Sequence, residues 1–199
     1  CFSYDFNDPI IFNKFVEDFE YFADRYFDHP SYFKINGRPV VWVLFSLFFK
    51  GDYERAFLEA RNRVRAKGYD VYIIGDAIWW GEPNKRLIQC LDAVSSYNLY
   101  FSLPGAGGLF MGEGVNNTSE LADKLRKLYQ QWRDVVTKTK VVGSDNYVDF
   151  QPGIIPRIWR DFEDYHPLFA LPLESKMGFV KMCEMARDLS EPALNTNLN

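Results

Sequence analysis

The sequence contains few of the residues that bind metals or act as nucleophiles. Its 199 residues include three cysteines and two histidines. The cysteines (Cys1, Cys90 and Cys183) form neither a CxxC pair nor any other metal-ligand spacing, and neither His29 nor His166 has a visible catalytic partner. We therefore expect no metal site and no cofactor. Cys90 and Cys183 occupy apolar positions in helical segments, so we expect both to be buried thiols.

Net positive charge, long apolar runs and nucleotide-binding motifs are also missing. The formal net charge is −4 and the pI is about 5.3, which argues against nucleic-acid binding. The apolar run at 40–49 is shorter than the roughly 18–20 residues that cross a membrane. The glycine-rich segment 102–116 contains neither GxxxxGK[ST] nor GxGxxG, which disfavours a phosphate cradle there.

Aromatic residues are abundant instead. The 18 Phe, 12 Tyr and 5 Trp make up 18% of the chain. We expect most of these rings to pack in the core, but some can offer a flat face to the apolar side of a sugar. A chain of this length is sufficient for one domain, spanning 1–199, with a sizeable core.

The segment 26–43 indicates the fold most clearly. Pro30 and Pro39 both stop helix, because proline lacks a backbone N–H and biases the preceding residue toward extended backbone. Asn36-Gly37 supplies a turn that tolerates positive φ. The run Val40–Phe45 is apolar at every position, which predicts a strand covered on both faces, as in parallel α/β sheets. We expect His29 to make a hydrogen bond within this connector.

Strand-like and helix-like segments alternate along the whole chain. Strands are predicted at 1–6, 39–46, 70–75, 93–101 and 140–151, and helices at 9–26, 53–67, 83–90, 118–135 and 175–189. Asp8 is expected to cap the first helix, Gly68 to stop the second, and Asn117 with Glu120 to form a capping box for the fourth. The inward-facing residues are expected to be Ala56, Phe57, Ala60 and Val64 in the second helix, and Leu121, Leu125, Leu128, Trp132 and Val135 in the fourth. Five alternations predict a parallel sheet with right-handed crossovers.

Two architectures fit this alternation, a doubly wound open sheet and part of a (β/α)8 barrel. A complete barrel typically has about 250 residues. The absence of a dinucleotide fingerprint weakens the open-sheet alternative. The chain begins inside a strand-like run and ends just after a helix, so we expect a piece of a larger barrel that lacks its first and last units.

Several short motifs recur in order along roughly residues 20–190. They are Tyr26–Tyr32, Ile35–Val40, Gly68-Tyr69 before a strand, Asp92–Tyr97, and Asp149–Gly153 with Arg157 downstream. In these motifs the sequence resembles the glycoside hydrolase family 99-like domains. This group includes endo-α-mannosidases and bacterial relatives from polysaccharide gene clusters, some of them labelled glycosyltransferases.

The resemblance implies a (β/α)8 TIM-barrel-like α/β fold, with about five βα units in this chain, acting on glycans at its carboxyl-terminal face. It implies retaining, metal-independent hydrolysis of an α-linked glycan. The family's catalytic carboxylates lie in an Asn-Glu-Trp-x-Glu-type strand end, and no such motif occurs in this sequence. Two alternatives therefore stay open: a non-catalytic glycan-binding or structural barrel domain, and a glycosyltransferase-associated protein of polysaccharide assembly.

Candidate site residues follow the predicted strands. Glycoside hydrolysis generally uses two carboxyl groups, and Asp5 and Asp76 are the candidates for catalysis. A structural hydrogen bond for Asp5 and a turn role for Asp76 remain open. Trp79 and Trp80 are adjacent in the loop after Asp76, which indicates a sugar platform. Further candidates for substrate binding are Glu82, Tyr97, Gln151, Arg157 and Trp159.

The expected partner is an oligosaccharide or polysaccharide, with no nucleic acid and no membrane span, and the oligomeric state is open. Two overlapping N-glycosylation sequons occur, Asn116-Asn117-Thr118 and Asn117-Thr118-Ser119. Together with the aromatic content they favour an extracytoplasmic or secreted protein.

Overall fold

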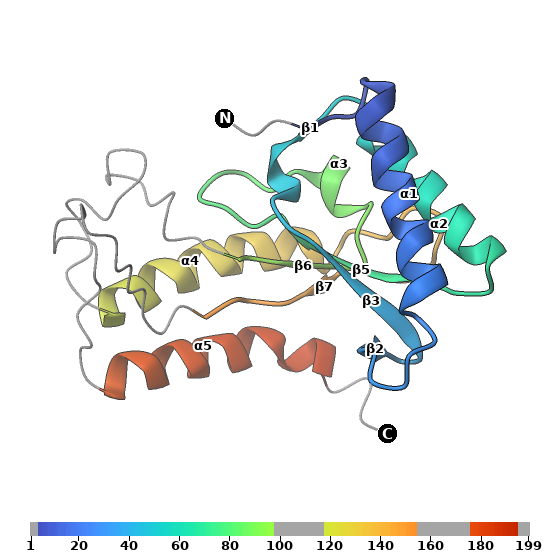
Figure 1. Cartoon of the computed structure of the whole chain (residues 1–199). Helices are drawn as coiled ribbons and strands as arrows, with labels where there is room; N and C mark the ends of the chain where they lie inside the picture. Colours follow the sequence, from blue (N-terminus) through green and yellow to red (C-terminus); the bar gives the residue numbers. More distant parts are fainter. Residues whose placement is uncertain (1–3, 98–117, 155–175, 195–199) are drawn as a thin grey trace, which may run out of the picture. The chain divides into compact units, whose positions relative to one another are not determined.

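The computed structural model of the chain describes residues 4–97, 118–154 and 176–194 (Figure 1). The chain divides into two compact units. Unit 1 comprises Cys1–Ala77, Asn84–Val94 and Thr139–Val148, and unit 2 comprises Ile78–Pro83, Ser95–Lys138 and Asp149–Asn199.

Strands and helices alternate along the described residues as predicted. The order is β1 (Tyr4–Asp5), α1 (Pro9–Arg25), β2 (Lys34–Ile35), β3 (Arg38–Val43), the 3₁₀ turn η1 (Ser46–Phe48), β4 (Phe49–Lys50), α2 (Tyr53–Ala66), β5 (Tyr72–Asp76), α3 (Lys85–Ile88), β6 (Ala93–Ser95), α4 (Thr118–Val136), β7 (Asp149–Phe150) and α5 (Lys176–Leu194). In this part of the chain β1 pairs with β4, and a five-stranded sheet has the order β2-β3-β5-β6-β7. Strands β3 and β5 are parallel, as expected for strands joined by a helical crossover.

Helices α1 and α2 lie side by side in unit 1 (Figure 1). Asp8 caps α1 as predicted, because its Oδ1 accepts the Ile10 N–H at 2.8 Å. The predicted inner stripe of α2 is confirmed. The helix stops before Gly68 as predicted, because Gly68 has a φ of 91°, a backbone conformation that glycine adopts without strain. The four buried stripe residues of α2 are Ala56, Phe57, Ala60 and Val64.

The connector before β3 makes the hydrogen bonds that its sequence suggested. His29 Nδ1 accepts the Ser31 N–H at 3.1 Å, which confirms its connector role. Asn36 and Gly37 have φ values of 50° and 77°, the signature of a tight hairpin turn. They join β3 to β2 in an antiparallel pair. The sequence predicted the turn but not the two-residue strand β2.

A buried ionic cluster joins β3, α2 and the start of β6. Asp92, 5% exposed, accepts from Arg38 Nη2 at 2.5 Å and from Arg61 Nη2 at 2.6 Å. It also accepts the Ile73 N–H at 2.9 Å. Two of the motifs that carry the family resemblance, Ile35–Val40 and Asp92–Tyr97, are therefore bonded to each other through Arg38 and Asp92.

The prediction for the second strand is wrong in two respects. The strand ends at Val43 rather than at residue 46, and Trp42 is 49% exposed, so β3 is not covered on both faces. The strand stops because Phe45 adopts a left-handed conformation, with φ 55°. For a bulky residue this conformation costs on the order of 1–3 kcal/mol. The expectation of two covered faces does hold for β5, whose five residues are all buried.

Three further expectations need correction or lie outside the described residues. The predicted strand at 140–151 is broken by a turn at Gly143 (φ 76°), which leaves the bridge Lys140↔Tyr147 and β7. Cys90 is buried as predicted, but Cys183 is only half-buried. Residues 1–3 and 98–101 of two predicted strands, and Asn117 of the capping box, lie outside the described residues.

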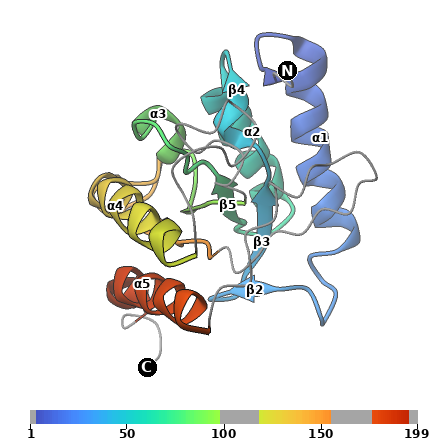
Figure 2. The same ribbon diagram turned by 90° about the vertical axis from the view of Figure 1, so that its left-hand side faces the viewer.

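In unit 2, helices α4 and α5 lie side by side (Figure 2). The predicted inner stripe of α4 is confirmed at Leu125, Leu128 and Trp132, which are buried, as are Met182 and Met185 of α5. Val135 is only half-buried and its neighbour Val136 is buried instead, while the side chain of Leu121 lies outside the described part of the chain. No helix in the described part of the chain is long and apolar enough to cross a membrane.

Candidate functional site

The loop after β5 holds a tryptophan in a fixed, solvent-facing position. The Trp79 side chain lies against Gly81, since a Cβ atom at Gly81 would be 2.3 Å from Trp79 Cζ2. Buried Trp132 donates its indole N–H to the carbonyl oxygens of Trp79 (3.0 Å) and Gly81 (3.2 Å). Trp79 nevertheless remains 43% exposed. The loop therefore presents a large, preorganised aromatic surface to solvent.

The neighbouring residues of this loop differ in exposure. Trp80 is half-buried, whereas the Glu82 carboxylate is exposed. Of the two tryptophans predicted as a sugar platform, Trp79 offers the more exposed side chain. Glu82 places a hydrogen-bond acceptor in the same loop.

A buried tyrosine links the segments that follow β6 and β7. Tyr129 of α4 donates its hydroxyl to Gly153 O at 2.8 Å, so Ser96 Oγ, 2.9 Å away, donates to the Tyr129 oxygen. A Cβ atom at Gly153 would lie 2.7 Å from Ser96 Oγ, so the close approach requires glycine. Burial raises the pKa of Tyr129 to about 12, against a smaller lowering by these hydrogen bonds.

This network brings two predicted site residues into one region of unit 2. Tyr97 follows Ser96 and is 55% exposed, and Gln151 lies two residues before Gly153 and is half-buried. Ser96 and Gly153 are fixed to the same hydroxyl, so the backbones that carry Tyr97 and Gln151 are held close together. A phenol and an amide near strand ends can donate hydrogen bonds to, and accept them from, sugar hydroxyls.

The two predicted catalytic carboxylates belong to unit 1. Asp5 is exposed, and its Oδ1 accepts the Asn7 N–H at 3.0 Å. Asp76 is 3% exposed, and its Oδ2 accepts the Phe45 N–H at 3.1 Å. The Asp76 carbonyl oxygen also accepts from Ser46 Oγ at 2.9 Å. Both side chains therefore have local structural bonds, and their catalytic role stays a prediction.

Arg157, Trp159 and the glycine-rich segment 102–116 lie outside the described residues. Within the described ranges, no three or more His, Cys, Asp or Glu side chains cluster closely enough to hold a metal ion.

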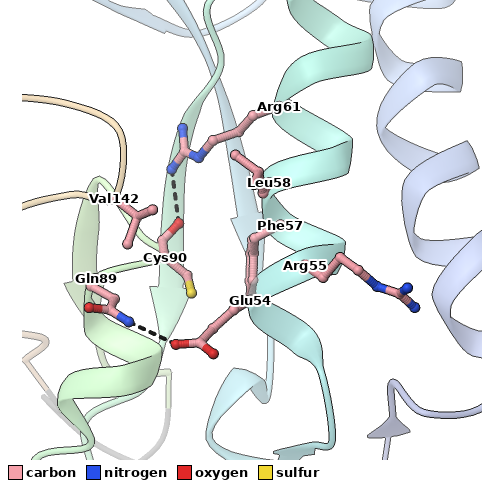
Figure 3. A pocket seen from close by; sticks show the side chains of 8 residues that line it. All are labelled: Glu54, Arg55, Phe57, Leu58, Arg61, Gln89, Cys90 and Val142. Atoms are coloured by element: carbon pink, nitrogen blue, oxygen red, sulfur yellow. Dashed lines mark hydrogen bonds between the residues drawn. The ribbon is translucent and has the colours of Figure 1, made fainter.

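A cavity of about 260 Å³ lies in unit 1 beside α2 (Figure 3). Gln89 Nε2 donates to Glu54 Oε1 at 2.8 Å across it. Burial raises the pKa of the Cys90 thiol to about 12, so this cysteine is not a nucleophile at neutral pH. The cavity is lined by Glu54, Arg55, Phe57, Leu58, Arg61, Gln89, Cys90 and Val142, none of them a predicted site residue.

The residues that support the site were not recognised from the sequence. Trp132 was predicted only as part of the apolar stripe of α4, and Tyr129 was not singled out. One signal was available, because a buried Tyr or Trp usually finds a partner for its polar atom. Their helical spacing with Leu125 places both on the inner face, but it does not identify the partner.

The comparisons relate this arrangement to known proteins. A solved "Glycoside hydrolase-like protein" matches with a TM-score of 0.64 and 21% identity, over 90% of this chain and 48% of that one. The family 99 endo-α-mannosidase from Bacteroides thetaiotaomicron matches with a TM-score of 0.56 and 18% identity, over 89% and 46%. Its complex with bis-tris-propane matches with a TM-score of 0.58 and 18% identity, over 89% and 49%.

No protein-family model and no curated protein matches the chain. The chain spans about half the length of the solved structures that it matches. The expected resemblance is confirmed for the fold: over that half, this chain has the α/β barrel-type fold of the family 99 glycoside hydrolase structures.

Proposed function

We propose that the chain is a carbohydrate-active domain that binds an α-linked oligosaccharide or polysaccharide through the loops after β5, β6 and β7. The observation that carries the proposal is the Trp79 ring, 43% exposed and lying against Gly81, in a loop whose backbone carbonyls are bonded to Trp132. Its setting in a glycoside-hydrolase-like fold supports a sugar ligand. The endo-α-mannosidase match supports α-linked mannosides as the first substrate class to test.

The proposed chemistry of binding divides between ring and polar groups. The apolar C–H face of a pyranose packs on the Trp79 indole, where it removes apolar surface from water. Glu82 accepts hydrogen bonds from sugar hydroxyls, and Tyr97 and Gln151 both donate and accept them. On a largely apolar surface, a small number of polar groups is enough to fix the orientation of a ligand.

For an active domain we propose retaining, metal-independent hydrolysis with Asp5 and Asp76 as the carboxylates. Retention requires one carboxyl group as acid and then base, and a second group as nucleophile. The test is cleavage of an aryl α-mannoside or an α-linked mannan fragment, with the product anomer read by ¹H NMR. We expect an α-anomer product, loss of most of the rate in Asp5→Asn and Asp76→Asn, and no effect of EDTA. An inverted product, or full activity in both variants, contradicts the proposal.

A non-catalytic glycan-binding barrel domain is the second candidate. It is favoured by the engagement of the Asp76 carboxylate with the Phe45 N–H. A role in polysaccharide assembly is a further form of this alternative. Binding without detectable cleavage of any arrayed glycan distinguishes both from a hydrolase.

The experiment for the binding proposal is an array of α-linked glycans probed with the wild type, Trp79→Ala and Trp80→Ala. We expect Trp79→Ala to weaken binding about tenfold or more, as for a central aromatic contact. The half-buried Trp80 is expected to contribute less. Unchanged binding in both variants contradicts the platform.

We also propose an extracytoplasmic or secreted setting, supported by the two sequons and the aromatic content. Asn116 and Asn117 lie outside the described residues. Expression in a glycosylating host, followed by a mass shift on deglycosylation, tests whether either sequon is used.

A further inference from the structure

Phe45 combines an unfavourable backbone with an exposed ring. Its φ is 55°, a conformation that glycine or asparagine adopts at lower cost. Its side chain is 42% exposed, so burial of the ring does not by itself account for the strain. A strained backbone conformation that the surrounding structure holds in place is often associated with function.

The surroundings that hold Phe45 are buried and specific. Asp76, at the end of β5, accepts the Phe45 N–H at 3.1 Å through Oδ2. Ser46, fully buried, donates its hydroxyl to the Asp76 carbonyl at 2.9 Å. The end of β3 is therefore pinned to the end of its parallel neighbour β5, at the carboxyl ends of both strands.

The same turn places a second ring beside the first. The Phe48 N–H donates to Phe45 O at 3.0 Å, and in a 3₁₀ turn side chains three residues apart lie on the same side. The centroids of the Phe45 and Phe48 rings are 6.2 Å apart and their planes are tilted by 41°. Phe48 is 45% exposed. The two rings form one aromatic surface, here called the Phe45–Phe48 pair.

Two charged side chains, those of Lys50 and Asp5, lie in the strand pair to which the segment directly after Phe48 belongs. After Phe48 comes β4, which pairs in parallel with β1 and sets Lys50 opposite Asp5. Both of these side chains are exposed. Two exposed rings, followed along the chain by an exposed ammonium group that pairs in register with an exposed carboxylate, offer both apolar packing and hydrogen bonding, which suits a pyranose better than a purely apolar partner.

We propose that the Phe45–Phe48 pair is a second sugar-stacking surface, located in unit 1 at the carboxyl end of β3, and that Asp76 is its positioning residue. The proposal rests on the proposed carbohydrate function and extends it to two aromatic residues at the end of β3. Asp76 acts by holding the Phe45 backbone and thereby the angle of its ring.

The test is isothermal titration with the tightest-binding α-linked oligosaccharide from the array. We expect Phe45→Ala and Phe48→Ala each to weaken binding about tenfold, and Phe45→Trp to restore it. Phe45→Gly removes the ring and relieves the positive φ, so its melting temperature is expected to equal or exceed that of the wild type while its affinity falls. Phe33→Ala, which removes a ring 66% exposed before β3, is the matched control and is expected to bind as the wild type does.

Asp76 is tested by comparing two substitutions in variants shown to be folded by circular dichroism. Asp76→Ala removes the acceptor for the Phe45 N–H, whereas Asp76→Asn retains an oxygen there, so the alanine variant is expected to bind more weakly. Wild-type affinity in Phe45→Ala and Phe48→Ala, with loss in Trp79→Ala, overturns this inference and leaves the proposed function standing. Failure of the wild type to bind any arrayed glycan overturns both.

Discussion

Single residues do much of the positioning in this chain through polar atoms at the ends of buried aromatic side chains. Tyr129 and Trp132 are both at most 1% exposed, and each sends its hydrogen-bond donor to a backbone carbonyl in a loop after a strand. The buried face of α4 thus fixes the loop after β5 and the loop after β7, although neither side chain is exposed. This arrangement fixes the backbone beside two exposed rings, those of Trp79 and Tyr97.

The Tyr129 hydroxyl gives a prediction at this scale. Phenylalanine at this position removes the donor to the Gly153 carbonyl and leaves the buried Ser96 hydroxyl without its acceptor, and an unsatisfied buried polar group costs about 1–3 kcal/mol. We therefore expect Tyr129→Phe to lower the free energy of unfolding at pH 7 by about that amount, measured by urea denaturation. An unchanged free energy of unfolding in Tyr129→Phe would contradict a stabilising role for these hydrogen bonds.

The pH dependence of the same hydroxyl has a definite sign. Because burial raises the pKa of Tyr129 to about 12, the folded state favours the protonated form. Its contribution is complete below pH 10, the usual tyrosine pKa, and is lost as the pH rises from 10 toward 12, by up to about 3 kcal/mol. Unfolding free energies across this range are expected to fall more steeply in the wild type than in Tyr129→Phe. Since the buried Cys90 titrates with the same sign in both proteins, their difference isolates Tyr129.

At the scale of elements, the packing is organised by residues far apart in sequence. Arg38 of β3, Arg61 of α2 and Asp92 before β6 meet in one buried cluster. This cluster accounts for two of the motifs in the family resemblance as structural features. It identifies the scaffold and carries none of the proposed chemistry.

The cluster predicts a large effect of one substitution. Asp92→Ala leaves two arginines without their buried partner, and breaking such a pair typically costs about 3–5 kcal/mol. We expect this loss of unfolding free energy in chemical denaturation. Asp18→Asn is a suitable control, because the Lys14–Asp18 pair is an exposed helical pair, and such pairs add little to stability. A loss in Asp92→Ala no larger than in the control would show that the cluster does not hold the elements together.

Local sequence was enough to predict the elements whose causes are local. The Asp8 cap, the Asn36-Gly37 turn, the α2 stripe and the Gly68 stop each depend on a few neighbouring residues, and all are confirmed. The end of β3 could not be predicted in this way, because Phe45 is held by Asp76, 31 positions later. The Trp79 loop also depends partly on local and partly on distant residues. Paired tryptophans marked the loop, but Trp132, which fixes it, lies 53 positions beyond Trp79.

At the scale of the whole molecule, the chain divides into two compact units. The chain as a whole has the fold of about half of the family 99 glycoside hydrolase structures. Unit 2 contains the Trp79 loop with Tyr97 and Gln151, and unit 1 contains Asp5, Asp76 and the Phe45–Phe48 pair. Both sets follow the carboxyl ends of strands, where barrels of this type bind their ligands. Above all, we propose that the Trp79 ring is a contact surface for an α-linked glycan.

The most direct test of that claim is the indole N–H region of a ¹H–¹⁵N NMR spectrum during titration with an α-linked mannose oligosaccharide. The chain contains five tryptophans, and the Trp79 signal is assigned as the one that Trp79→Phe removes. We predict a dose-dependent shift that is largest for Trp79, and weaker glycan binding by Trp79→Phe. If saturating amounts of every α-linked glycan on the array leave the Trp79 signal in place, the account is contradicted.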